Sequence, residues 1–229
     1  MSLFSRYNQK VIATIHSLIL RIILRGFNLL YHQFTWMYNF AAWLVSAGRW
    51  DDWIRASGGM KLESPLLDVG CGQGVLLEKS SLNGIISVGL DESPQMLRRS
   101  QKRLPPGKDN LVRGLGQFLP FASGSFRSIT ATFPAPYLFE RSTMNEIRRV
   151  MSPQGRLIIL LTAVVTGSSL HERLIRLSGS LFGFEDLPAA AIQRVLLLLQ
   201  QAGFNAHISI KDVEQSRLYF IFARLDREK

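Results

Sequence analysis

Residues 66–74, with the sequence LLDVGCGQG, place a carboxylate beside closely spaced glycines, a pattern suited to binding a small charged ligand. The apolar start is typical of a buried strand. The glycines let the backbone approach a ligand closely, because glycine lacks a Cβ atom. A helix beginning directly after the turn offers unpaired N–H groups in its first turn, and Asp68 can pair with a cation. These features together favour a zwitterionic nucleoside over a bare phosphate.

The glycine spacing separates two kinds of nucleotide site. A dinucleotide turn needs glycines at its first, third and sixth positions, but the sixth position counted from Gly70 is Val75. The third glycine comes one residue early, at Gly74. This Asp-x-Gly-x-Gly-x-Gly spacing resembles motif I of class I S-adenosylmethionine-dependent methyltransferases. The resemblance implies that the loop, with Cys71 and Gly72, lies beneath the methionine part of that cofactor. An ordinary strand-to-helix turn is the alternative.

A second acidic residue follows the next apolar run. Residues 85–90 have the length of a strand and lead to Asp91, about as far downstream as a ribose-binding acid lies in nucleotide folds. A carboxylate can accept hydrogen bonds from both ribose hydroxyls. Ser93 and Pro94 predict the N-cap and first position of the following helix. This run resembles the family's second cofactor segment, which implies cofactor contacts from Asp91 and Glu92. A solvated acid at a strand end is the alternative.

The third segment, residues 114–121, departs from the family pattern Gly-Asp-Ala-Glu-x-Leu-Pro-Phe. Leu115 stands where the adenine-binding aspartate is usual, and this change removes an acceptor for the exocyclic amine. Gly116 and Gln117 stand where alanine and an acid are frequent. Losing a hydrogen bond to a charged group costs roughly 1.5–3 kcal/mol. We therefore expect the affinity for the cofactor to be modest. The resemblance also implies that Gly116 and Gln117 line the cofactor site.

The later segments complete an α/β pattern. Residues 146–156 resemble the family's helix, proline-glycine turn and fifth strand, and residues 157–161 would continue that strand. A helix over residues 190–201 precedes a hairpin formed by residues 209–212 and 218–224. We predict an α/β fold with a Rossmann-like, mostly parallel seven-stranded sheet, helices on both faces and an antiparallel C-terminal hairpin.

One edge of this sheet collects the candidate residues. Ligands of such sheets bind outside the carboxyl ends of the strands. Asp68, Asp91, Leu115 and Phe133 all fall at those predicted ends. This shared edge is the main argument for a single site that binds S-adenosyl-L-methionine.

Composition limits the remaining possibilities. The chain has 229 residues, one cysteine and a net charge of +10. A single cysteine excludes an internal disulfide and favours a reducing, cytoplasmic compartment. No metal is expected, because the few histidine and cysteine residues lack the spacing of a zinc site. The positive charge would suit nucleic acid or an anionic membrane surface. The cations are spread and no RNA-binding module is evident, so the membrane surface is the preferred partner.

The N-terminal part is expected to differ from the rest. Residues 10–30 predict a basic amphipathic helix with a wide apolar arc. This helix either lies in a membrane interface, peripheral at the inner face, or packs over the cofactor cleft. Its arginines interrupt any signal-peptide or membrane-spanning pattern. We expect residues 1–60 to form this helical segment and residues 61–229 the methyltransferase domain.

Two segments are candidates for the walls of an acceptor pocket. Residues 31–39 resemble a tyrosine-rich segment that helps close the site in the lipid-quinone type of the family, which implies that Tyr31 and Tyr38 lie near the substrate. Residues 163–187 would form an insertion on the acceptor side. Both walls are apolar, so a hydrophobic small-molecule or lipid acceptor follows as a hypothesis. Trp50 and Trp53 could line this pocket, mark an interface or fill the core.

The chemistry asks little of the protein, because a methyl group on sulfonium is already activated. The enzyme must align acceptor, methyl carbon and sulfur. A general base is needed only for a poor nucleophile. The candidates are His171, Tyr137, His32 and Glu140.

We therefore predict an S-adenosylmethionine-dependent methyltransferase that acts on a hydrophobic small molecule or lipid. The alternative is a catalytically weak or inactive binding protein with the same fold, docked to a membrane or a partner through its N-terminal helix. Methylation of a nucleic-acid base is disfavoured, because the sequence FPAPY at residues 133–137 lacks the polar first residue of the motif used for amide nitrogens.

Overall fold

The computed structural model describes residues 46, 48–108, 110–167 and 189–226. The chain divides into two compact units, Met1–Ala42 and Trp43–Lys229, and all described residues belong to the second. The predicted helix over residues 10–30 therefore lies outside the described residues. No helix in the described part of the chain is long and apolar enough to cross a membrane.

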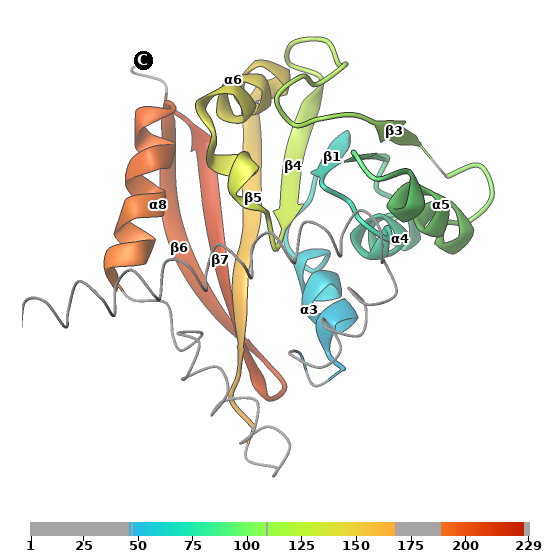
Figure 1. Ribbon diagram of the computed structural model, residues 1–229, viewed down its shortest axis with the longest axis horizontal. Coiled ribbons are helices and arrows are strands. Elements are labelled where there is room, and N and C mark those ends of the chain that lie inside the picture. The colour runs from blue at the N-terminus through green and yellow to red at the C-terminus, as the bar shows by residue number, and fades with distance from the viewer. Residues whose placement is uncertain (1–45, 47, 109, 168–188, 227–229) are drawn as a thin grey trace, which may run out of the picture. The chain divides into compact units, whose positions relative to one another are not determined.

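Within the described residues, seven strands form one sheet in the order β3-β2-β1-β4-β5-β7-β6 (Figure 1). Neighbouring strands are parallel from β3 to β5, and β7 runs antiparallel to both β5 and β6. This arrangement confirms the predicted sheet. The strands are β1 (Leu66–Val69), β2 (Ser87–Asp91), β3 (Leu111–Arg113), β4 (Phe126–Thr132), β5 (Met151–Val165), β6 (Phe204–Val213) and β7 (Ser216–Leu225).

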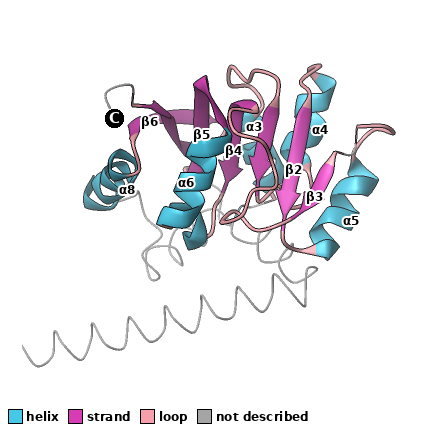
Figure 2. Cartoon of the chain, turned by 90° about the horizontal axis from the view of Figure 1, so that it is seen from above, coloured by secondary structure: helices cyan, strands magenta, loops and turns pink. Residues whose placement is uncertain are grey.

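Helices cover both faces of the sheet, as predicted (Figure 2). Residues of β5 alternate between two apolar clusters, because successive strand side chains point to opposite faces. Leu157 and Ile159 pack with α6 and α8, whereas Ile158 and Leu160 pack with Trp53 of α3. The helical elements are α3 (Trp50–Ser57), α4 (Val75–Leu82), α5 (Pro94–Arg103), the 3-10 helix η1 (Pro136–Phe139), α6 (Arg141–Val150) and α8 (Ala189–Gln201).

Strand β5 is longer than predicted at both ends. Its first residue, Met151, already pairs with Phe126, and the pairing resumes with Arg156 opposite Ser128. The expected proline-glycine turn is therefore an irregularity inside the strand. At the other end the strand continues to Val165, pairing with β7 as far as Ser216. Residues 163–165 of the predicted insertion thus belong to the sheet, and residues 168–187 lie outside the described residues.

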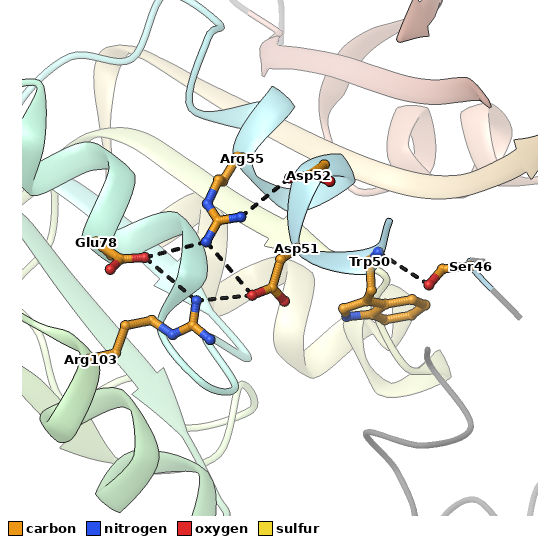
Figure 3. Close-up of polar contacts among 7 residues, drawn as sticks. All are labelled: Ser46, Trp50, Asp51, Asp52, Arg55, Glu78 and Arg103. Carbon is orange, nitrogen blue, oxygen red and sulfur yellow. Dashed lines mark hydrogen bonds and ion pairs between the residues drawn. The ribbon is translucent and has the colours of Figure 1, made fainter. Parts of the chain in front are cut away.

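Helix α3 is fastened to α4 and α5 by charged side chains (Figure 3). Arg103 of α5 lies 3.0 Å from Asp51 of α3 and 3.5 Å from Glu78 of α4. Arg55 of α3 lies 3.8 Å from both carboxylates. Such partly exposed pairs are individually weak, but a shared network restrains orientation. Trp50 and Trp53 lie on the same helix and pack with the apolar side chains of β5 and β7.

A second charged pair holds the segment after β3. Arg149 of α6 donates to the carbonyl oxygens of Leu119 and Phe121, at 2.8 and 2.6 Å. Glu146 accepts from the N–H of Leu119 at 2.8 Å and from Arg149 at 2.7 Å. The Arg149 guanidinium and this N–H hold the pKa of Glu146 below its usual value, despite opposing desolvation. This pair fixes residues 119–121, the last part of the predicted adenine segment.

Replacing Arg149 with lysine is expected to loosen that segment, because an ammonium cannot reproduce the forked contacts of a guanidinium. We expect a stability loss of about 1 kcal/mol, measured by urea unfolding, and faster amide exchange at Leu119 and Phe121. Arg127→Lys is the control, because the only side-chain interaction of Arg127 found among the described residues is an exposed ion pair with Glu63 at 3.8 Å. Equal exchange rates in both variants would contradict this role for Arg149.

Candidate functional site

The structure brings the two predicted carboxylates to one edge of the sheet. Asp68 is the third residue of β1, and Asp91 is the last residue of β2, the parallel neighbour of β1. Both side chains are buried. Burial, and secondly the negative charge of Asp91, raise the pKa of Asp68 to about 7, although a hydrogen bond from Thr130 opposes the shift. The site therefore holds a carboxylate that a cation can stabilise in its charged form.

The loop after β1 has the backbone conformation that its glycines allow. Gly70, Gly72 and Gly74 have φ values of +73°, +53° and +76°. The N–H groups of Gly70 and Cys71 both donate to the carbonyl of Leu90, at 2.8 and 3.0 Å. The loop is thus tied to the end of β2, and α4 begins directly after Gly74.

Asp91 is fixed by the loop that it faces. One carboxylate oxygen accepts from the N–H of Gly72 at 2.9 Å, and the other accepts from the N–H of Ser93 at 2.9 Å. Ser93 caps α5 through a bond from the N–H of Met96, with Pro94 in the first helical position, which confirms the predicted helix start. Contact of Asp91 with a ribose stays a prediction.

Tyr137 of η1 lies over the glycine loop. A Cβ atom added at Gly70 would meet the Tyr137 hydroxyl at 2.9 Å, and one added at Gly116 would meet its ring at 3.0 Å. The side chain therefore reaches from the segment after β3 to the loop after β1. This contact also explains why glycine stands at position 116, where the family pattern has alanine.

The charges around Tyr137 identify its neighbours. Burial raises the pKa of Tyr137 well above 10, and the negative charges of Asp91, Glu92 and Asp68 add to this shift, with a smaller part from Cys71. Four of the predicted cofactor residues therefore act electrostatically on one phenol. This phenol is held in its protonated form, and the role of Tyr137 as a general base stays a prediction. Burial likewise raises the pKa of Cys71, in agreement with its interpretation as an unreactive loop residue.

Gln117 and Glu140, two other candidates from the sequence, form a hydrogen bond with each other. The Gln117 side-chain amide donates to Glu140 at 3.0 Å, which links the segment after β3 to the end of η1. Leu115 is 46% exposed and Phe118 is 75% exposed. Leu115 therefore stands at the surface beside Gly116, and its aliphatic side chain supplies no acceptor. The loss of the expected aspartate is not compensated at that position.

Phe133 belongs to an aromatic group. It follows β4 directly and has a φ of +48°, which is rare for a residue with a side chain. Its ring stacks on Trp50 with centroids 4.2 Å apart, and the Trp53 ring lies 6.0 Å away. Trp53 is a buried core residue, whereas Trp50 is half-buried. These rings form an apolar wall at the end of β4.

Several predicted residues lie outside the described part of the chain. They are the pocket candidates Tyr31 and Tyr38 and the base candidates His32 and His171. Two residues that the sequence analysis missed do contribute: Thr130 bonds to Asp68, and Ser100 packs against Gly74. Neither belongs to a motif, so only strand pairing and helix packing reveal them.

Comparison with known proteins agrees with this arrangement. Residues 67–159 match the protein family described as methyltransferase domain. A solved S-adenosylmethionine-dependent methyltransferase from Thermotoga maritima has the same fold, with a TM-score of 0.57 and 15% identity over 88% of this chain and 99% of that one. The family match over residues 67–159, together with the sheet order and the glycine loop, makes this chain similar to S-adenosylmethionine-dependent methyltransferases.

The similar curated proteins act on different acceptors. A demethylmenaquinone methyltransferase of Symbiobacterium thermophilum is 33% identical over 129 residues, covering 51% of each chain. An 18S rRNA (guanine-N(7))-methyltransferase of Mus musculus is 27% identical over 147 residues, covering 64% of this chain and 48% of the relative. The chain spans about half the length of the curated relatives that it matches.

Proposed function

We propose that this chain transfers the methyl group of S-adenosylmethionine to a hydrophobic small molecule, with a quinol-like ring as the favoured acceptor. One observation carries the proposal: two buried carboxylates, Asp68 and Asp91, flank a glycine loop in positive-φ conformations at the carboxyl ends of neighbouring strands. The residues present fit the cofactor, because one buried oxygen of Asp68 has no hydrogen-bond partner among the described residues and can accept from an ammonium group.

The roles of the protein residues follow from their positions. Asp68 would bind the amino group of the cofactor, the loop at Gly70 and Gly72 would lie beneath its methionine part, and Asp91 would bind the ribose. When bound, the cofactor supplies an activated methyl group. The Tyr137 side chain must turn away from Gly70 to admit the ligand, because its hydroxyl lies over that residue. It then remains a neutral hydrogen-bond donor at the rim.

The acceptor class is supported by the aromatic wall. Trp50 and Phe133 are stacked at the end of β4, on the edge that the carboxylates share. Flat apolar rings favour an acceptor that can stack on them. The demethylmenaquinone methyltransferases among the relatives also support a ring-bearing, lipid-like acceptor.

The test first measures binding of the cofactor and then transfer of its methyl group. Calorimetry with S-adenosylmethionine and S-adenosylhomocysteine is expected to show one site on the full chain. Labelled cofactor is then incubated with demethylmenaquinone, with a bacterial lipid extract and with total RNA. Label in the lipid fraction supports the proposal, and label confined to RNA overturns the acceptor class. Binding without transfer to any acceptor favours the non-catalytic alternative, and lack of binding overturns both.

We also propose that residues 10–30 hold the protein at an anionic membrane surface in the cytoplasm, on the basis of their apolar arc and basic residues. Flotation with vesicles containing anionic lipid is expected to carry the full chain. Deletion of residues 1–30 is expected to abolish that flotation. Unchanged flotation of the shortened chain would contradict an anchoring role.

A further inference from the structure

Thr130 lies directly beside Asp68 in the sheet. The two residues are register partners in the parallel strands β4 and β1. The Thr130 hydroxyl lies 2.8 Å from one carboxylate oxygen of Asp68, Oδ1, and both side chains are buried. The only other acceptor found for this hydroxyl in the described part of the chain, the carbonyl of Leu67, is farther away at 3.4 Å. The hydroxyl is thus placed to donate to the carboxylate.

The second carboxylate oxygen of Asp68, Oδ2, accepts no such hydrogen bond from a described residue. It is buried and has no hydrogen-bond partner among the described residues. An unpaired buried carboxylate oxygen is costly, so native sites leave one only where strain, water or a ligand accounts for it. Here the glycine loop begins two residues later, at Gly70. The unpaired oxygen therefore points to a donor that arrives with the ligand.

We propose that Thr130 is a positioning residue for cofactor binding, whose hydroxyl occupies one oxygen of Asp68 and leaves the other available to the ammonium group of the cofactor. The inference rests on the cofactor site proposed above. Without the hydroxyl, the carboxylate would lose the bond that fixes its rotation. Threonine suits this position, because a β-branched side chain has few rotamers in a strand.

The hydroxyl also favours the charged form of Asp68. The groups that face this carboxylate are Thr130 of β4, Asp91 of β2, Cys71 of the loop and Tyr137 of η1. Cys71 and Tyr137 have raised pKa values and remain neutral near pH 7, whereas the charge of Asp91 raises the pKa of Asp68. Thr130 alone among them lowers it. Removing the hydroxyl therefore leaves more of Asp68 protonated.

The experiment compares Thr130→Val with the wild type and with Thr130→Ser, by calorimetry with S-adenosylhomocysteine between pH 6 and pH 9. We expect the valine variant to bind about tenfold more weakly at pH 6, and the ratio of the two dissociation constants to fall by pH 9 to the smaller loss that comes from the unfixed rotation of the charged carboxylate. One pKa unit corresponds to a tenfold change, and titration of the ligand amine cancels in the ratio. Serine, which keeps the hydroxyl, is expected to restore the wild-type values.

The outcomes separate this inference from the proposed function. Failure of the wild type to bind overturns the cofactor site itself. If the wild type binds and the valine variant has the same dissociation constant at every pH, the proposed role of Thr130 is overturned. A loss that is the same at every pH, or that serine does not rescue, shows a packing role and also overturns it. Circular dichroism confirms folding, and Thr130→Ala replaces the valine variant if that variant does not fold.

Discussion

Gly74→Ala is expected to cost the protein about 2–5 kcal/mol of unfolding free energy. Gly74 precedes α4 with a φ of +76°, where an L-residue is strained by roughly 1–2 kcal/mol. An added Cβ atom would also lie 3.0 Å from the Cβ and 3.2 Å from the Cα of Ser100. Because a backbone atom is involved, rotation of the serine cannot relieve the contact. Overpacking of this kind costs typically 1–3 kcal/mol.

Gly72→Ala provides a matched control within the same loop. Gly72 has a φ of +53°, but nothing lies within 4 Å of a Cβ atom added there. Its substitution is expected to cost only the backbone strain, roughly 1–2 kcal/mol. Urea unfolding followed by circular dichroism measures both losses. Equal losses at the two positions would show that contact with Ser100 contributes nothing.

A double variant tests the contact itself. Ser100→Gly removes the side-chain atoms that an alanine at position 74 would meet. We expect Gly74→Ala to be less costly in that background, because residues in contact are not additive. Since α4 and α5 approach at this point, the same contact sets the spacing between the glycine loop and the helix that follows Asp91. Full additivity of the two substitutions would contradict this explanation.

The sequence predicts those parts of the site that depend on short local patterns of residues. Asp68 and Asp91 were placed correctly at strand ends, because an apolar run, an acid and a turn occur together at each position. The N-cap at Ser93 follows from the Ser-Pro pair for the same reason. Strand order then brings these local features to one edge.

The rest depends on contacts between distant segments. The position of Tyr137 over Gly70 and Gly116 depends on the path of η1, and the residues 133–137 indicate only a stiff turn. Thr130 has no motif, and its pairing with Asp68 appears only once β4 lies beside β1. The extra length of β5 likewise comes from pairing with β7, not from the composition of residues 162–165.

Asp68→Asn is expected to stabilise the protein at pH 8 and to abolish cofactor binding. The folded-state pKa of Asp68 is about 7, against 3.8 for an exposed group, so the folded state binds the proton more tightly than the unfolded state. The stability from this proton is complete below about pH 3.8 and is lost as the pH rises through about 7. At about 1.4 kcal/mol per pKa unit, the loss is on the order of 4 kcal/mol.

Asparagine removes this dependence because it carries no charge. Its amide would still accept from Thr130, but its NH2 group would replace an oxygen that has no partner, at a cost of about 1–3 kcal/mol. We therefore expect the variant to be less stable than the wild type at pH 4 and more stable at pH 8. Urea unfolding across this range measures the crossover. Asp212→Asn, at an exposed ion pair, is expected to show none.

The binding measurement completes the argument. An amide cannot neutralise an ammonium group, so calorimetry at pH 8 with S-adenosylhomocysteine is expected to show at least a hundredfold loss of affinity in Asp68→Asn. Higher stability together with lost binding would show that the buried charge of Asp68 serves ligand binding. The same charge destabilises the protein when no ligand is bound. A variant that binds normally, or that is destabilised equally at both pH values, would show that Asp68 serves only the packing of β1 against β4.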